Sequence, residues 1–289
     1  MLRRRTHRSS VAAAAALATC LSGLALVPAH AQGDPGRGTF YTTKTPTSIG
    51  SGGAVSSVDP EASRIGRDVL RSGGNAADAI IAMAAALGVT EPYSSGIGGG
   101  GFLVYYDARS GKVSTIDGRE TAPASMPNNA FINPDSSPPG QPYRFTPELV
   151  TSGVSVGTPG TPATWDQALR RFGTMSFKQA LQPATRLAAR GFVVDSTFRQ
   201  QTLDNAVRFR AFDSTRDLFL PGGDAPQVGS VFRNPDLAAT YQRVARRGTS
   251  FLYDGRLGRQ IVRVVHDPPK TASTTLPVPI PPTARPLVV

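Results

Sequence analysis

One segment that is apolar on nearly every side limits most strongly how this chain can fold. It runs from Ala76 to Leu87 and is followed by Gly88. Asn75 precedes it as an N-cap residue, and Asp78 completes a capping box three positions later. The pattern predicts a helix. A helix that is apolar all round must be buried, so this one belongs inside a layered domain.

Further helices and one β-hairpin are predicted around this segment. Asp59 and Pro60 start an amphipathic helix that stops at Gly73. Residues 102–107 and 112–117 have the composition of strands, and the short turn between them predicts an antiparallel hairpin. The remaining predictions are a long Pro-, Asn- and Ser-rich loop at 124–150 and helices at about 160–172, 176–190 and 235–247.

Residues 1–31 have the pattern of a secretory signal peptide. Arginines precede an apolar run from Val11 to Val27, and a small-residue cleavage motif ends at Ala31. The run is shorter than the ~20 residues of a membrane-spanning helix, so a permanent anchor is less favoured, as is twin-arginine export. We expect Sec export with cleavage after Ala31, which makes the protein secreted, periplasmic or part of the cell envelope. Residues 32–52 are expected to form an extended lead-in.

Net charge does not point to a nucleic-acid partner. The chain carries +11, and cleavage after Ala31 leaves +7. Its arginines are scattered along the expected helices without interleaved aromatic residues, which is typical of solvated helix faces. No nucleic-acid partner is therefore predicted.

The residue types that remain after export limit the possible chemistry. Cys20 is the single cysteine, and His266 is the one histidine beyond the signal. Without a cysteine beyond the signal, the exported chain cannot form a Cys-His pair or a thiolate zinc site, and one histidine cannot form a zinc site of several histidines. A Ser-His-Asp triad would have to use His266. The sequence predicts no metal and no cofactor. A Thr nucleophile activated by its own N-terminal amine would need neither residue type.

A glycine run matches a dinucleotide-binding pattern only as a string of letters. Gly96, Gly98 and Gly101 have the required spacing, but a helix precedes them and a strand follows, the reverse of what that motif needs. Glycines here allow a close approach of another backbone or of a substrate, and their N–H groups could face an anion. A tight packing turn between helix and strand is the alternative.

Several blocks of sequence follow one another in an order that is specific to one family. They are Gly73–Ala79, Glu91–Phe102, Asp117–Pro123, Val156–Thr161 and Tyr253–Gly255. In this order they resemble the large-subunit half of gamma-glutamyltransferases. The resemblance assigns residues 53–266 to that region.

The resemblance implies an α+β fold of the N-terminal-nucleophile hydrolase type, an αββα sandwich that is incomplete in this chain. It implies an enzyme made as a self-cleaving precursor, which transfers the gamma-glutamyl group of glutathione and related amides to water, an amino acid or a peptide. The acyl-enzyme of that family forms on the N-terminal Thr of its small subunit.

One ligand contact is implied for this chain. By resemblance, Arg119 binds the alpha-carboxylate of the glutamyl group, a task that suits a planar, permanently charged guanidinium. Without the resemblance, Arg119 would be an exposed charge paired with Asp117 or Glu120. Gly98–Gly101 are assigned a structural role, and Glu91 and Asp78 a capping or core hydrogen-bonding role.

Residues 267–289 depart from the family pattern. Seven prolines in this stretch predict an extended linker in place of a packed sheet. Thr271, Thr274, Thr275 and Thr283 lack the His that closely follows the family's nucleophile, so no catalytic residue is assigned. We expect a truncated or frameshifted reading frame. Two hypotheses stay open: an enzyme portion that needs the missing small subunit, and a non-catalytic remnant or weak gamma-glutamyl-binding protein.

Overall fold

The computed structural model describes residues 47–120, 122, 126–146 and 148–271. These residues all belong to one compact unit, Phe40–Val289. The predicted signal peptide, most of the predicted lead-in, and residues 272–289 of the predicted Pro-rich tail lie outside the described residues.

The apolar segment forms the central helix, as predicted. Helix α2 (Ala76–Thr90) begins with the expected capping box, in which Asn75 and Asp78 each accept a hydrogen bond from the other's backbone N–H. It continues past the predicted end because Gly88 serves for close packing and not as a stop. A Cβ at Gly88 would lie 2.5 Å from the Tyr241 hydroxyl and 3.0 Å from Gly96 Cα.

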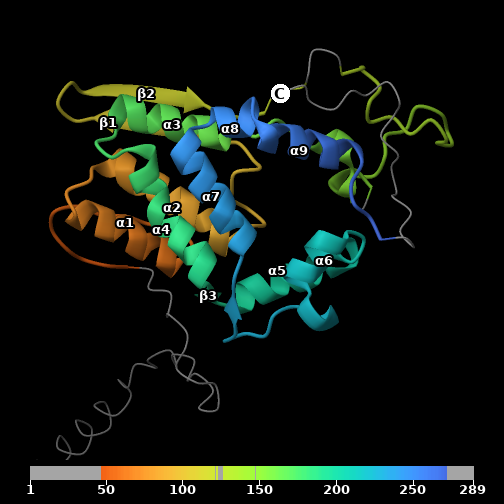
Figure 1. Cartoon of the computed structure of the whole chain (residues 1–289). Coiled ribbons are helices and arrows are strands. Elements are labelled where there is room, and N and C mark those ends of the chain that lie inside the picture. The colour runs from red at the N-terminus through yellow and green to blue at the C-terminus, as the bar shows by residue number, and fades with distance from the viewer. Residues whose placement is uncertain (1–46, 121, 123–125, 147, 272–289) are drawn as a thin grey trace, which may run out of the picture. The chain divides into compact units, whose positions relative to one another are not determined.

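Three helices build the core together with α2. Helix α1 (Pro60–Arg71) packs against α2, α2 packs against α4 (Phe177–Arg190), and α4 packs against α7 (Pro235–Arg247), an arrangement that Figure 1 shows. Each of these three further helices begins with a side-chain N-cap, and all lie where the sequence predicts them. Tyr241 of α7 is fully buried and donates a hydrogen bond to Ala85 O of α2 at 3.0 Å.

The predicted hairpin is present. Strands β1 (Phe102–Asp107) and β2 (Lys112–Asp117) pair antiparallel, with Phe102 opposite Asp117. One face lies beside α3 (Thr161–Phe172), where the Tyr105 ring stacks on Phe172 with centroids 4.3 Å apart. The other face is exposed, and Phe102, Val104 and Tyr106 are each more than 60% accessible. A second sheet, β3 (Phe192–Val193) with β4 (Val231–Phe232), was not predicted.

Several further helices complete the described chain, and none of them was predicted from the sequence. The described residues of the predicted 124–150 loop form turns and an isolated bridge between Ile132 and Pro142 before the first 3-10 helix. The helices are α5 (Ser196–Phe209), α6 (Asp213–Phe219), α8 (Ser250–Tyr253) and α9 (Arg256–His266), and the 3-10 helices are η1 (Leu149–Thr151), η2 (Gly153–Ser155) and η3 (Pro221–Gly223).

Candidate functional site

Three segments far apart in sequence meet at the end of the hairpin. The glycine turn that enters β1 pairs with the residue that leaves β2, because Gly118 N–H donates to Gly101 O at 2.9 Å and Gly101 N–H donates to Gly118 O at 3.3 Å. The start of α3 joins them, since the N–H groups of Gly160 and Thr161 both donate to Gly99 O at 3.0 Å. The Thr161 hydroxyl donates to the same oxygen at 2.8 Å.

Absent side chains make this junction possible. A Cβ at Gly118 would lie 1.9 Å from the Thr164 hydroxyl oxygen, and one at Gly160 would lie 2.0 Å from Gly118 O. A Cβ at Gly100 would lie 2.4 Å from the same carbonyl. The packing role predicted for the glycine run is therefore carried by Gly100, because Gly98, Gly99 and Gly101 have open space around the Cβ position.

Arg119 follows this junction directly, and one edge of its guanidinium lies against Glu120. Its backbone N–H donates to Asp117 Oδ1 at 2.9 Å, and its Nε lies 3.0 Å from Glu120 Oε2. The side chain is 58% exposed. No hydrogen bond to a described residue engages Nη1 or Nη2, so within the described part of the chain the two terminal nitrogens have no hydrogen-bond partner. Both partners weighed from the sequence, Asp117 and Glu120, contact Arg119.

Glu120 is the part of this site that the sequence analysis missed as a functional residue. A Cβ at Gly157 would lie 2.5 Å from Glu120 Cγ, and one at Gly100 would lie 2.9 Å from its carboxyl carbon, so two glycines wall the side chain. Its Oε2 atom is buried and has no hydrogen bond to a described residue. The nearby Arg119 Nε offsets the cost of burying that charged oxygen. Glu120 thus fixes one edge of the guanidinium.

The remaining predicted residues lie at the two ends of α2. Asp78 caps its N-terminus and also accepts hydrogen bonds from Thr174 and Met175, so it has both roles named for it. Glu91 is the C-cap residue of α2, and its N–H donates to Leu87 O at 2.7 Å. Neither residue contacts Arg119 through a described hydrogen bond or ion pair.

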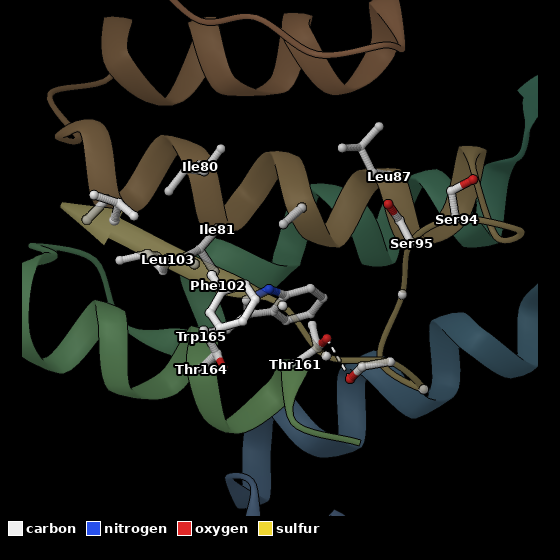
Figure 2. A pocket seen from close by; sticks show the side chains of 18 of the residues that line it. Ile80, Ile81, Leu87, Ser94, Ser95, Phe102, Leu103, Thr161, Thr164 and Trp165 are labelled. Atoms are coloured by element: carbon white, nitrogen blue, oxygen red, sulfur yellow. Dashed lines mark hydrogen bonds between the residues drawn. The ribbon is translucent and has the colours of Figure 1, made fainter. Parts of the chain in front are cut away.

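A cavity of ≈ 760 Å³ lies beside α2 and β1, and Arg119 does not line it. Its lining is mainly apolar, and Ser94, Ser95, Thr161 and Thr164 contribute hydroxyl groups. The hydrogen bond of the Thr161 hydroxyl to Gly99 O is drawn as a dashed line in Figure 2. The labelled apolar side chains in Figure 2 are Ile80, Ile81 and Leu87 of α2, Phe102 and Leu103 of β1, and Trp165 of α3.

The described residues contain neither a candidate metal cluster nor a candidate membrane-spanning helix. No group of three or more His, Cys, Asp or Glu side chains among them could hold a metal ion. Within the same part of the chain, no helix has both the length and the apolar composition to cross a membrane.

Comparisons with known proteins agree on one family. The family described as Gamma-glutamyltranspeptidase has a sequence model that matches residues 62–271. The chain is 37% identical over 241 residues to the "Glutathione hydrolase proenzyme" of Bacillus subtilis (strain 168), covering 83% of this chain and 40% of that protein. It is 33% identical over 218 residues to the protein of the same name from Escherichia coli (strain K12), covering 73% and 35%.

A solved structure gives the same result for the fold. The gamma-glutamyltranspeptidase of Helicobacter pylori superimposes with a TM-score of 0.69 at 32% identity, over 75% of this chain and 61% of that one. The mixed helices and sheets are therefore part of an N-terminal-nucleophile hydrolase fold, as predicted. The chain spans 40% or less of the length of the two curated relatives. Because its sequence matches the family model and its structure superimposes on a solved member, this chain belongs to the gamma-glutamyltranspeptidase family.

Proposed function

We propose that this chain is the large-subunit portion of an enzyme that transfers or hydrolyses the gamma-glutamyl group of glutathione and related amides. Family membership supports the reaction class, because the matched relatives are named glutathione hydrolases and the solved neighbour a gamma-glutamyltranspeptidase. Water, amino acids and peptides are the proposed acceptors of the group. The protein is proposed to act outside the cytoplasm, after removal of residues 1–31.

The observation that carries the proposal is the way in which Glu120 holds Arg119. Glu120 occupies the Nε edge of the guanidinium at 3.0 Å, and the Nη1 and Nη2 groups make no hydrogen bond to a described residue. A carboxylate can accept from those two groups in a bidentate geometry. The alpha-carboxylate of a gamma-glutamyl compound is the proposed ligand, so Arg119 orients the donor and takes no part in bond breaking.

The bond-breaking group is proposed to come from a segment that this sequence does not contain. The hydroxyl oxygen of an N-terminal Thr attacks the gamma-carbonyl carbon and gives its proton to the N-terminal amine. The C–N bond of the amide then breaks, and the leaving amine takes that proton. Water or an acceptor amine then attacks the ester, which releases the Thr hydroxyl. His266, the one histidine among the described residues, is the last residue of α9 and has no place in this scheme.

The second candidate is a non-catalytic chain that binds gamma-glutamyl compounds weakly through Arg119. The hairpin face formed by Phe102, Val104 and Tyr106 is left uncovered by the described residues. An exposed apolar face of this kind marks an interaction surface, which the first candidate requires and the second does not. Both candidates require Arg119 to bind a carboxylate, and they differ in turnover.

The role of Arg119 is tested in a full-length relative. In the Bacillus subtilis proenzyme, the residue at the position of Arg119 is replaced by Ala. The control replaces the residue at the position of Arg109, which is exposed in the hairpin turn of this chain. We expect the KM for the gamma-glutamyl donor to rise roughly 10- to 100-fold in the first variant, because hydrogen bonds to a charged group are lost. The control should keep its KM. An unchanged KM in the first variant removes Arg119 from the site.

A further inference from the structure

The Tyr253 hydroxyl lies at the N-terminus of α3, although Tyr253 belongs to α8. It donates a hydrogen bond to Pro159 O at 2.6 Å and accepts one from Ala163 N–H at 3.2 Å. A phenol has one proton to donate and lone pairs to accept, so a single hydroxyl can make both bonds. The Tyr253–Gly255 block contributes to the family resemblance, which implies no function for it.

Helix α3 lacks the usual local cap. Its N-cap residue is Gly160, which has no side chain to accept from the first N–H groups of the helix. The Tyr253 hydroxyl supplies that acceptor from a position 90 residues beyond Ala163 in the sequence. It also satisfies the carbonyl of Pro159, the residue just before the N-cap. Tyr253 therefore caps α3 from another element.

The loop that Tyr253 holds is the loop that walls Glu120. Gly157 approaches Glu120 so closely that a Cβ would lie 2.5 Å from Cγ. Gly160 approaches the backbone just before Arg119, where a Cβ would lie 2.0 Å from Gly118 O. A shift of the loop would open the slot in which the Glu120 carboxylate lies.

Tyr253 is itself firmly placed. Its neighbour Leu252 is 2% exposed, and a Cβ at Gly258 would lie 2.3 Å from Leu252 O. The turn from α8 to α9 is equally close, since a Cβ at Gly255 would lie 2.3 Å from Phe251 O. The hydroxyl is therefore presented by a fixed turn and can act as an anchor.

We propose that Tyr253 is a positioning residue, which holds the loop before α3 and so keeps Glu120 against the guanidinium of Arg119. The contact path runs from the Tyr253 hydroxyl to Pro159, through Gly157 to Glu120, and from Glu120 to Arg119. The value of this placement for substrate binding rests on the proposed function of Arg119. The placement of Glu120 by Tyr253 does not depend on that function.

The test follows the Arg119 Nε–H group by NMR in the uniformly ¹⁵N-labelled chain. Arg119 Nε lies 3.0 Å from Glu120 Oε2. The negative charge of a carboxylate beside a guanidinium repels hydroxide and so slows the exchange of Nε–H with water. The Arg119 signal is assigned by its loss in Arg119→Lys. The Glu120→Gln variant should abolish the protection. In Tyr253→Phe, which removes one oxygen and keeps the ring, we expect exchange of Arg119 Nε–H and of the Ala163 amide to become about tenfold faster.

Two further variants make the result decisive. Tyr143→Phe is the matched control, because the Tyr143 hydroxyl has no hydrogen bond within the described chain, and it should leave both exchange rates unchanged. Gly157→Ala acts on Glu120 from the loop and should remove the Arg119 protection without speeding exchange at Ala163. If circular dichroism shows that Tyr253→Phe is unfolded, the Gly157→Ala variant still tests whether the loop positions Glu120.

The outcomes separate this proposal from the proposed function. Unchanged Arg119 Nε–H exchange in folded Tyr253→Phe overturns the positioning role, whether or not Ala163 exchanges faster. So does unchanged exchange in Gly157→Ala. L-Glutamate added to the same wild-type sample probes the function of Arg119 separately. A missing shift of the Arg119 signal with L-glutamate argues against carboxylate binding and leaves the Tyr253 result intact.

Discussion

Asp78 and Thr174 lie 96 positions apart, and their contact joins the N-terminus of α2 to the loop before α4. The Thr174 hydroxyl donates to Asp78 Oδ2 at 2.7 Å, and its backbone N–H donates to Oδ1 at 2.9 Å. The N–H groups of Met175 and Asn75 add two more bonds at 2.9 Å. The carboxylate is completely buried, so these donors replace its hydration.

Replacing Asp78 by Asn should destabilise the chain strongly. The amide keeps the shape but removes the charge and turns one accepting oxygen into a donor that faces other donors. We expect a loss of about 2–4 kcal/mol in the free energy of unfolding, measured by urea denaturation. Asp68→Asn is the matched control, because Asp68 is 46% exposed and takes part only in surface pairs. Its change should stay within about 0.5 kcal/mol.

The stability that Asp78 contributes should depend on pH. Burial by itself raises the pKa of this carboxyl, but hydrogen bonds from Asn75, Met175 and Thr174 outweigh burial, and the pKa lies below its ordinary value of 3.8. A lowered pKa in the folded state gives stability that is present above 3.8 and is lost as the pH falls through the folded pKa. The difference in unfolding free energy between wild type and Asp78→Asn should therefore shrink below pH 3.8. A difference that grows on acidification would contradict the assignment.

Adding one methyl group at Gly160 should disrupt the junction that holds Arg119. The new Cβ would lie 2.0 Å from Gly118 O, which is backbone and cannot turn away. We expect Gly160→Ala to cost roughly 1–3 kcal/mol in thermal or urea unfolding. The control is Gly98→Ala, at a glycine of the same junction with no atom within 4 Å of the Cβ position. Equal stability of the two variants would show that the three segments do not meet as described.

Removing the Tyr241 hydroxyl tests the packing of α7 on α2. The hydroxyl is buried and donates to Ala85 O at 3.0 Å, and burial raises its pKa. It therefore stays protonated and keeps donating up to high pH. Tyr241→Phe should cost about 1 kcal/mol in urea denaturation. Tyr143→Phe is the control, and its stability should equal that of wild type.

The sequence predicted the elements that depend on interactions between residues close together in the chain. The capping box of Asn75 and Asp78, the proline after Asp59 and the hairpin of 102–117 depend on residues that are neighbours in sequence, and all three are present. Helix α5 was missed because only Phe198, Thr202 and Ala206 are buried on it, a stripe too narrow to stand out among polar residues. Strands β3 and β4 have two residues each, too few to show alternation.

The candidate site was predicted only at the residue that the resemblance supplied. Arg119 is named by its motif, whereas Glu120 gains its role from Gly100 and Gly157, which are 57 positions apart and meet only in the fold. Tyr253 is similar, because its partner Pro159 lies 94 positions away. A charged pair at adjacent positions was the one signal for Glu120, and it is too common to indicate a site.

Hydrolysis of a chromogenic gamma-glutamyl amide by the purified chain tests whether these residues supply the attacking group. Release of p-nitroaniline from gamma-glutamyl-p-nitroanilide is followed at neutral pH against a sample without protein. Because the attacking Thr is proposed to lie outside this sequence, we expect a rate equal to that of the blank. Release above the blank that persists through purification would contradict the account, since it would require a nucleophile within these 289 residues.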